Sequence, residues 1–154
     1  MTDVASGSGR LRMIASALSI GGLQRHIFLC AQQSNPRCST YEESKQAWRQ
    51  LKRTAKALDI ASAPPVWRGH PSRPATPVEL GNGTILRSKV DCLRVCEQGP
   101  IAVVYPDGVW YHSVAGEVLD RIVREHLVGG RTVDEYVFAV DNLHPGMATD
   151  QSVQ

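Results

Sequence analysis

The sequence predicts a small α/β protein in which helices pack against a sheet. Three observations lead to this fold class: short apolar runs typical of strands, two segments with apolar residues at helical spacing, and a tight turn between the last two runs. The elements follow as strand, helix, long loop, three strands and helix. The 154 residues suit one domain, and a hydrophobic fraction of 42% is enough for an ordinary core.

The first half of the chain predicts a strand and then a helix. The apolar run "RHIFLCA" has bulky, strand-favouring residues at its centre, and we expect its strand to end at Cys30. Asn35-Pro36 marks a loop. Thr40 then suits a helix N-cap, and Glu43 three residues later completes a capping-box pattern. An apolar stripe at helical spacing runs along this helix: Trp48, Leu51, Ala55 and Leu58.

The second half predicts three strands and a helix. Residues 84–90 form one strand, as the second arm of a hairpin around Gly81-Asn82-Gly83. Residues 101–105 are a near-continuous apolar run, as in a buried strand. A Pro-Asp-Gly turn leads to a partner strand over 109–111. The segment "AGEVLDRIVREHLVGG" is a helix with an apolar face, and its two final glycines stop it.

The remaining segments set the expected domain organisation. Residues 1–22 read as a flexible N-terminal tail, and residues 23–140 as the domain itself. Residues 62–77 hold five prolines, which break helices and strands alike, so we expect a surface insertion there. After Phe138 the chain has no strong periodicity, and residues 141–154 read as a C-terminal tail.

Charge and hydropathy narrow the function classes. The formal net charge is +2, and the basic residues are scattered except in "RQLKRTAK", which reads as the solvated face of a helix. We therefore expect no nucleic-acid partner. No apolar run reaches the ~18 residues of a membrane span, so we expect no membrane insertion. The N-terminus makes a poor signal peptide, which favours a cytoplasmic protein with reduced thiols.

The four cysteines are the main functional signal. They form two close pairs, Cys30 with Cys38 and Cys92 with Cys96, each next to the end of an expected strand. We expect all four to lie in loops at one edge of the sheet. In a reducing compartment, such pairs point to metal binding or redox chemistry rather than to a disulfide framework.

Spacing alone leaves four interpretations open: an iron–sulfur cluster, a zinc ion, redox-active thiols, or buried cysteines without a ligand. Structural zinc usually has a pair with two intervening residues, whereas these pairs have seven and three. A 2Fe-2S cluster needs two thiolates on each iron and fits the broader spacing. The plant-type and bacterial four-iron ferredoxin spacings are absent. Thiol oxidoreductases also use two intervening residues, at the start of a helix.

The segment "CLRVCEQGPIAVVYPDGVWYHSVAGEVLDRIVREHLVGG" resembles the bacterial thioredoxin-like 2Fe-2S ferredoxins, whose fold is related to the small iron–sulfur subunit of NADH:quinone oxidoreductase. The motifs that carry the resemblance are Cys92 and Cys96, Gly99-Pro100, Tyr105-Pro106-Asp107-Gly108, Trp110-Tyr111 and "REHLVGG". The family's first cysteine ends strand one, as Cys30 does, and its second lies in the next loop, as Cys38 does. The resemblance covers about residues 25–138.

This resemblance implies a thioredoxin-like mixed sheet with the cluster in loops at one edge. It implies one 2Fe-2S cluster per chain with Cys30, Cys38, Cys92 and Cys96 as ligands, in a one-electron carrier that is not itself an enzyme. Redox partner proteins and a homodimer are further expectations. The alternative function is a zinc-stabilised, thioredoxin-like module that binds other proteins.

Several other residues have expected roles, taken from their positions in the sequence. Arg37 and Arg94 adjoin ligands and would stabilise a reduced cluster, unless they simply face solvent. Gly99 would allow a tight backbone path under the cluster, unless it is only a turn glycine. Trp110 and Tyr111 belong either to a dimer contact or to the core. We expect His126 on the last helix to be a packing or capping residue.

Overall fold

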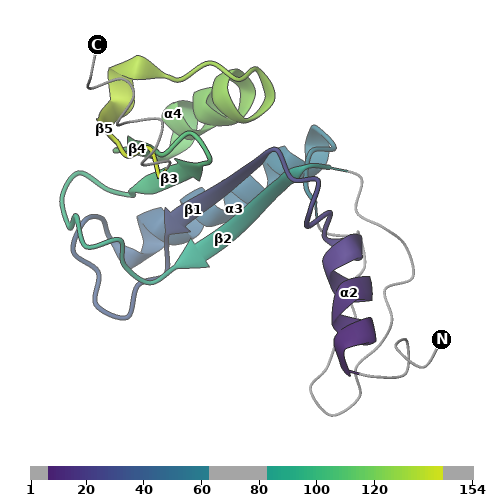
Figure 1. Ribbon diagram of the computed structural model, residues 1–154. Helices are drawn as coiled ribbons and strands as arrows, with labels where there is room; N and C mark the ends of the chain where they lie inside the picture. The colour runs from purple at the N-terminus through teal and green to yellow at the C-terminus, as the bar shows by residue number, and fades with distance from the viewer. Residues whose placement is uncertain (1–6, 63–82, 144–154) are drawn as a thin grey trace.

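The structure, a computed structural model, describes residues 7–62 and 83–143 (Figure 1). The expected insertion over 62–77 and the first arm of the expected hairpin therefore lie outside the described residues, apart from Ser62. So do residues 1–6 and 144–154. The domain boundaries at residues 23 and 140 stay a prediction.

The sheet has five strands in the order β2-β1-β3-β4-β5. The strands are β1 (Arg25–Cys30), β2 (Ile85–Val90), β3 (Ala102–Tyr105), β4 (Val109–Tyr111) and β5 (Val137–Val140). Strand β2 pairs in parallel with β1, and the other neighbours are antiparallel, so the sheet is mixed as expected. Strand β5 is a correction, because we expected no regular element there.

Helix α3 (Tyr41–Ala57) begins where the capping box predicts. The Glu43 amide donates to Thr40 Oγ1 at 3.1 Å, and the Thr40 amide donates to Glu43 Oε1 at 3.0 Å. Leu51 and Ala55 of the expected stripe are buried, and Trp48 and Leu58 pack against the core. The sequence did not indicate that the polar Ser44 is fully buried in the first turn of α3.

The last helix has two parts. Residues Gly116–Arg121 form α4, and Ile122–Val128 continue as a π-helix, η1, which ends at Gly129. A short 3₁₀ turn, η2 (Asp134–Tyr136), precedes β5. One further helix, α2 (Gly7–Ala17), lies within the segment expected to be a tail. Across the described ranges, no helix is both long and apolar enough to cross a membrane.

The main helices cover one face of the sheet. Helix α3 contacts both α4 and η1, and their apolar side chains share a core with alternate residues of the strands, such as Ile27, Val104 and Tyr111. Figure 1 shows α3 behind β1 and β2, and α2 apart from the sheet. The opposite sheet face carries Phe28, Val103 and Trp110, which that core cluster does not include.

Candidate metal centre

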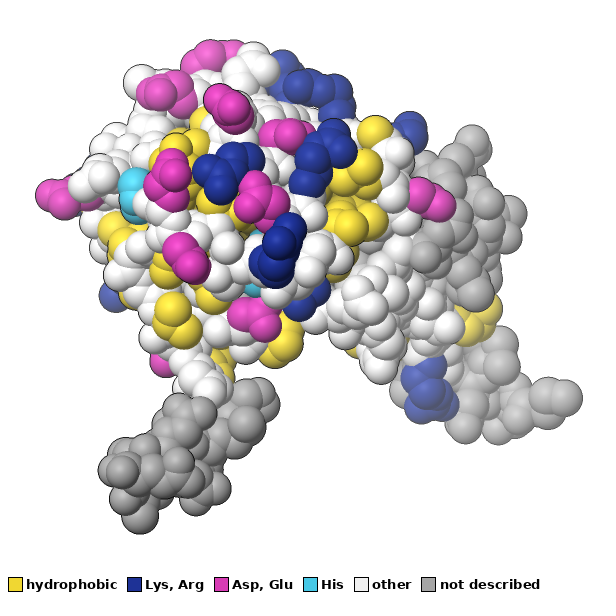
Figure 2. All heavy atoms as spheres, turned by 90° about the horizontal axis from the view of Figure 1, so that it is seen from above, with side chains coloured by type: hydrophobic (Ala, Val, Ile, Leu, Met, Phe, Trp, Pro, Cys, Tyr) yellow, Lys and Arg dark blue, Asp and Glu magenta, His cyan; other side chains and the backbone are white. Residues whose placement is uncertain are grey.

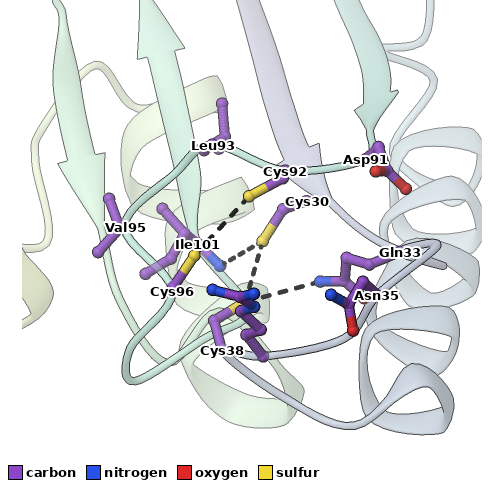
Figure 3. A pocket seen from close by; sticks show the side chains of 11 residues that line it. Cys30, Gln33, Asn35, Cys38, Asp91, Cys92, Leu93, Val95, Cys96 and Ile101 are labelled. Carbon is purple, nitrogen blue, oxygen red and sulfur yellow. Dashed lines mark hydrogen bonds between the residues drawn. The ribbon is translucent and has the colours of Figure 1, made fainter.

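Four cysteines from two distant parts of the chain line one pocket at the edge of the sheet (Figure 3). Cys30 is the last residue of β1, and Cys38 lies in the loop before α3. Cys92 and Cys96 lie in the loop between β2 and β3. Because β1 runs antiparallel to β3, the end of β1 meets the loop that enters β3. The fold thus brings together all four predicted site residues.

The sulfur atoms form two pairs. Cys30 Sγ lies 3.5 Å from Cys38 Sγ, and Cys92 Sγ lies 3.9 Å from Cys96 Sγ. All four cysteines are free, and both separations far exceed the ~2 Å of a disulfide bond. Two thiolates on one tetrahedral metal with bonds of ~2.3 Å would lie about 3.8 Å apart. Each pair therefore has the spacing of two ligands on one metal ion.

The pairing provides two separate pairs of sulfur donors, one from Cys30 and Cys38 and one from Cys92 and Cys96. A 2Fe-2S cluster needs two thiolates on each of its two irons, which is the donor set that these pairs provide. The residues present therefore fit this cluster.

Burial differs between the two pairs. Cys30 is 2% exposed, whereas Cys92 is exposed and Cys38 and Cys96 are intermediate. Burial raises the pKa of the Cys30 thiol to about 12, although the Ile101 amide lowers it. The hydrogen bond to Cys92 raises the pKa of Cys96, and the charge of Arg37 lowers it. Ionised sulfurs in this pocket therefore need a cationic partner, which a bound metal supplies.

Backbone amides point at two of the sulfurs. Ile101 N donates to Cys30 Sγ at 3.1 Å, and Arg94 N donates to Cys92 Sγ at 3.1 Å. Arg94 belongs to the loop that carries Cys92 and Cys96, whereas the amide on Cys30 comes from Ile101, just before β3. Hydrogen bonds of this kind stabilise negative charge on ligand sulfur.

Gly99 allows the backbone to pass close to Cys38. Its amide donates to the Cys38 carbonyl at 2.8 Å, and a Cβ atom at this position would overlap the Cys38 side chain, including Sγ. Only glycine allows the loop to pass this close to the sulfur.

Left-handed backbone conformations concentrate around the sulfurs. Four non-glycine residues in the two cysteine-bearing loops have positive φ: Gln32 (51°), Arg94 (68°), Cys96 (61°) and Gln98 (51°). Such conformations are costly and persist only where the surroundings impose them, which is common at functional sites.

The structure places the other residues with expected roles in different environments. Arg37 lines the pocket and is exposed, and Arg94 is also exposed, so both guanidinium groups are open to solvent. Tyr111 is a core residue, and Trp110 lies on the opposite face of the sheet. His126 is fully buried, in keeping with a packing role. The sequence did not indicate Gln33, a buried side chain that reaches Cys38; its one signal was a polar residue between two predicted ligands.

Comparisons with known proteins point to one group. A "Ferredoxin, 2Fe-2S" of Aquifex aeolicus (strain VF5) is 44% identical over 64 residues, which are 42% of this chain and 57% of that protein. A "Ferredoxin, 2Fe-2S" of Clostridium pasteurianum is 41% identical over 49 residues, which are 32% of this chain and 48% of that protein. The chain thus spans about half the length of these curated relatives. No family model matches it.

Solved structures extend the likeness to the fold. A thioredoxin-like [2Fe-2S] ferredoxin from Aquifex aeolicus superposes with a TM-score of 0.55 at 26% identity, over 77% of this chain and 93% of that one. A second structure, of the wild-type protein, gives 0.54 at 27% identity, over 76% and 98%. The resemblance to the thioredoxin-like 2Fe-2S ferredoxins and the expected fold are both confirmed.

Proposed function

We propose that this chain is a one-electron carrier that holds one 2Fe-2S cluster. The observation that carries the proposal is the arrangement of four cysteine sulfurs as two metal-spaced pairs in one pocket. Similarity to proteins named 2Fe-2S ferredoxins supports it. The proposed ligands are Cys30 and Cys38 on one iron, and Cys92 and Cys96 on the other.

The cluster supplies one-electron redox chemistry when bound, its net charge changing from about −2 to about −3. The chain holds the ligand sulfurs, donates amide hydrogen bonds to them and limits the access of water to Cys30. No acid or base is needed, because electron transfer requires proximity and a matched potential. We therefore propose an electron carrier rather than an enzyme.

The proposed partners are a reductase and an acceptor protein. Figure 2 shows acidic and basic side chains interspersed on one face of the molecule. On the last helix they form neighbouring pairs, Arg121 with Glu125 and Arg124 with Asp120. Mixed charge of this kind gives weak long-range steering, so the rate of reduction by a partner should depend only weakly on salt.

We further propose that two copies associate through the sheet face opposite α3 and α4. An aromatic row crosses this face. Phe28 lies 4.0 Å from His26 and 6.3 Å from Tyr105 between ring centroids, and Trp110 lies 6.4 Å from Phe138. Aromatic side chains are enriched at interface centres. The row carries no fixed charge, so a second copy can face it without like-charge repulsion.

The oligomeric state tests this contact. Phe138 is 44% exposed, and Phe138→Ser should lower the molar mass measured by light scattering from that of two chains to that of one. Val128 on η1 is 55% exposed and lies outside the aromatic row, so Val128→Ser is the matched control and should stay dimeric. A monomeric parent protein would refute the proposal.

The proposed compartment is the cytoplasm. Cysteines in a reducing compartment stay available as metal ligands rather than forming disulfides. We also propose that residues 23–140 form the domain that holds the cluster.

The visible spectrum of anaerobically purified protein, before and after dithionite, tests the proposed function. We expect a coloured protein that bleaches on reduction, with two irons and two sulfides per chain. A colourless protein with one zinc ion per chain would instead support the protein-binding module. Cys92→Ser should perturb the spectrum of the cluster, whereas Ser39→Ala, in the other cysteine-bearing loop, should leave it unchanged.

A further inference from the structure

Gln33 is a buried side chain directed at the candidate metal centre. It lies in the loop between Cys30 and Cys38 and is 5% exposed. Its Nε2 atom lies 3.6 Å from Cys38 Sγ, within hydrogen-bonding range for sulfur (Figure 3). Among the described residues, it is the one side chain other than cysteine with a hydrogen bond to a cysteine sulfur.

Helix α3 holds the Gln33 amide in place. Ser44 Oγ donates to Gln33 Oε1 at 2.9 Å, and Ser44 is fully buried. Ser44 Oγ also accepts a hydrogen bond from the backbone amide of Gln32 at 2.9 Å. The hydroxyl therefore fixes both the loop backbone and the orientation of the Gln33 side chain.

The chemistry of the partners sets the direction of the amide. An ionised thiolate accepts hydrogen bonds and cannot donate them. The Gln33 oxygen faces the hydroxyl of Ser44, so its NH₂ group is left to face the sulfur. The donor is therefore aimed at the Cys38 sulfur, where reduction would increase the negative charge.

A donor at this position acts on the energy of reduction. Adding an electron to a cluster increases the negative charge on its ligand sulfurs, so an N–H group directed at a ligand stabilises the reduced state more than the oxidised state. The Gln33 side chain is itself buried, which limits the screening of its amide dipole by water. The amides of Ile101 and Arg94 act alike, but they belong to the backbone and do not depend on side-chain identity.

We propose that Gln33, positioned by Ser44, raises the reduction potential of the cluster through its hydrogen bond to Cys38. This inference rests on the proposed function. A competing role is structural: the same side chain ties the loop to α3, and in that role its loss would lower stability and leave the potential unchanged.

Gln33→Met separates the two roles. Methionine has a similar length and shape but no donor. Ser44 keeps an acceptor in this variant, because its Oγ also lies 3.0 Å from the Tyr41 carbonyl. The matched control is Gln46→Met. Gln46 is exposed on α3, the helix that carries Ser44, and its side-chain amide donates to Glu42.

The measurements are iron and sulfide per chain, the midpoint potential from an anaerobic redox titration, and the resonance Raman bands of the Fe–S(Cys) bonds. Gln33→Met should keep its iron and sulfide, show shifted Fe–S(Cys) bands and have a lower midpoint. At a fixed solution potential, its ratio of reduced to oxidised protein should fall several-fold. Ser44→Ala should shift the midpoint in the same direction but less, and Gln46→Met should match the parent.

The outcomes separate the two proposals. Full iron and sulfide with an unchanged midpoint in Gln33→Met would overturn the role of Gln33 and leave the proposed function standing. A parent protein that cannot bind iron and sulfide would overturn the proposed function itself. If Gln33→Met loses its iron, Ser44→Ala decides: a lowered midpoint supports the role of Gln33, and an unchanged one overturns it.

Discussion

His126 Nε2 lies 2.6 Å from Asp107 Oδ2, and this contact joins the last helix to the turn between β3 and β4. On the other side of the ring, Nδ1 lies 2.7 Å from the hydroxyl of Tyr111, which also accepts a hydrogen bond from Val133 N at 3.1 Å. Arg25 Nε donates to the same Asp107 oxygen at 2.9 Å. A neutral imidazole with its proton on Nε2 satisfies these partners together: Tyr111 donates to Nδ1, and His126 donates to Asp107.

Removing the Tyr111 hydroxyl should destabilise the fold. Tyr111→Phe leaves His126 Nδ1 and the Val133 amide without a partner in a buried site, at a cost of about 1–3 kcal/mol. Urea unfolding of the metal-loaded protein measures this loss. Tyr41→Phe is the control, because Tyr41 makes an exposed hydrogen bond to Gln32, and its free energy of unfolding should change little.

Stability should fall as the solution becomes mildly acidic. Burial lowers the pKa of His126 below its ordinary 6.5, although the hydrogen bond to Asp107 opposes this shift. A histidine that stays neutral in the folded protein is protonated at higher pH in the unfolded chain. The free energy of unfolding therefore falls as pH falls from about 7.5 to about 5.5. Burial lowers the pKa of His26 in the same direction.

The variant His126→Gln isolates this effect, because an amide can donate to Asp107 without titrating near neutral pH. Its urea midpoint should fall less than that of the parent over the same pH range. Asp107 titrates lower: burial raises its pKa, but hydrogen bonds from Arg25 and His126 outweigh burial and hold it below its usual 3.8. The stability it contributes is lost only at more acidic pH. Equal midpoint shifts in parent and variant would contradict the assignment to His126.

A methyl group at position 99 should disrupt the metal centre. In Gly99→Ala, the added Cβ overlaps Cys38 Sγ and Cβ, so the sulfur must move away from its pair with Cys30. We expect iron per chain, measured on the purified protein, to fall several-fold. Gly22→Ala is the control, since its Cβ would meet only the Ser19 carbonyl at 3.8 Å. Full iron in Gly99→Ala would show that the loop can relax around the methyl group.

The N-terminal cap of α3 should contribute measurably to stability. Thr40→Ala removes the side-chain acceptor of the Glu43 amide and should cost about 1 kcal/mol in the free energy of unfolding. Thr54→Ala, near the C-terminal end of the same helix, should be neutral or slightly stabilising, because alanine is the better helix former. A loss at Thr54 as large as that at Thr40 would argue against a capping effect.

Elements defined by local patterns could be predicted from the sequence. Strand β1 and helix α3 each carry a complete signal within one short segment, and the cysteines follow from the resemblance and from their positions at strand ends. Strand β5 could not be predicted in this way. It has four residues, mostly exposed, and its regular structure comes from pairing with β4, which is distant in sequence.

The hydrogen bonds around the candidate metal centre were also hard to predict. Gln33 and Ser44 are separated by a loop, and neither residue type indicates burial. Gln32, between Cys30 and Gln33, has a left-handed backbone conformation, and its backbone amide binds Ser44 in the first turn of α3. This arrangement holds the loop against the helix. The Ile101 amide reaches Cys30 through the antiparallel pairing of β1 with β3, a relationship that no local pattern encodes.

The unequal burial of the two sulfur pairs gives the proposed cluster one solvent-exposed side and one buried side. Cys92 faces solvent, whereas Cys30 lies behind the sheet edge and the loop that packs on α3. A partner that docks on the Cys92 side comes close to a ligand sulfur, while one on the far side of α3 is separated from it by a helix about 10 Å thick. Electron tunnelling weakens steeply with distance, so in the proposed carrier a partner would exchange electrons fastest from the Cys92 side.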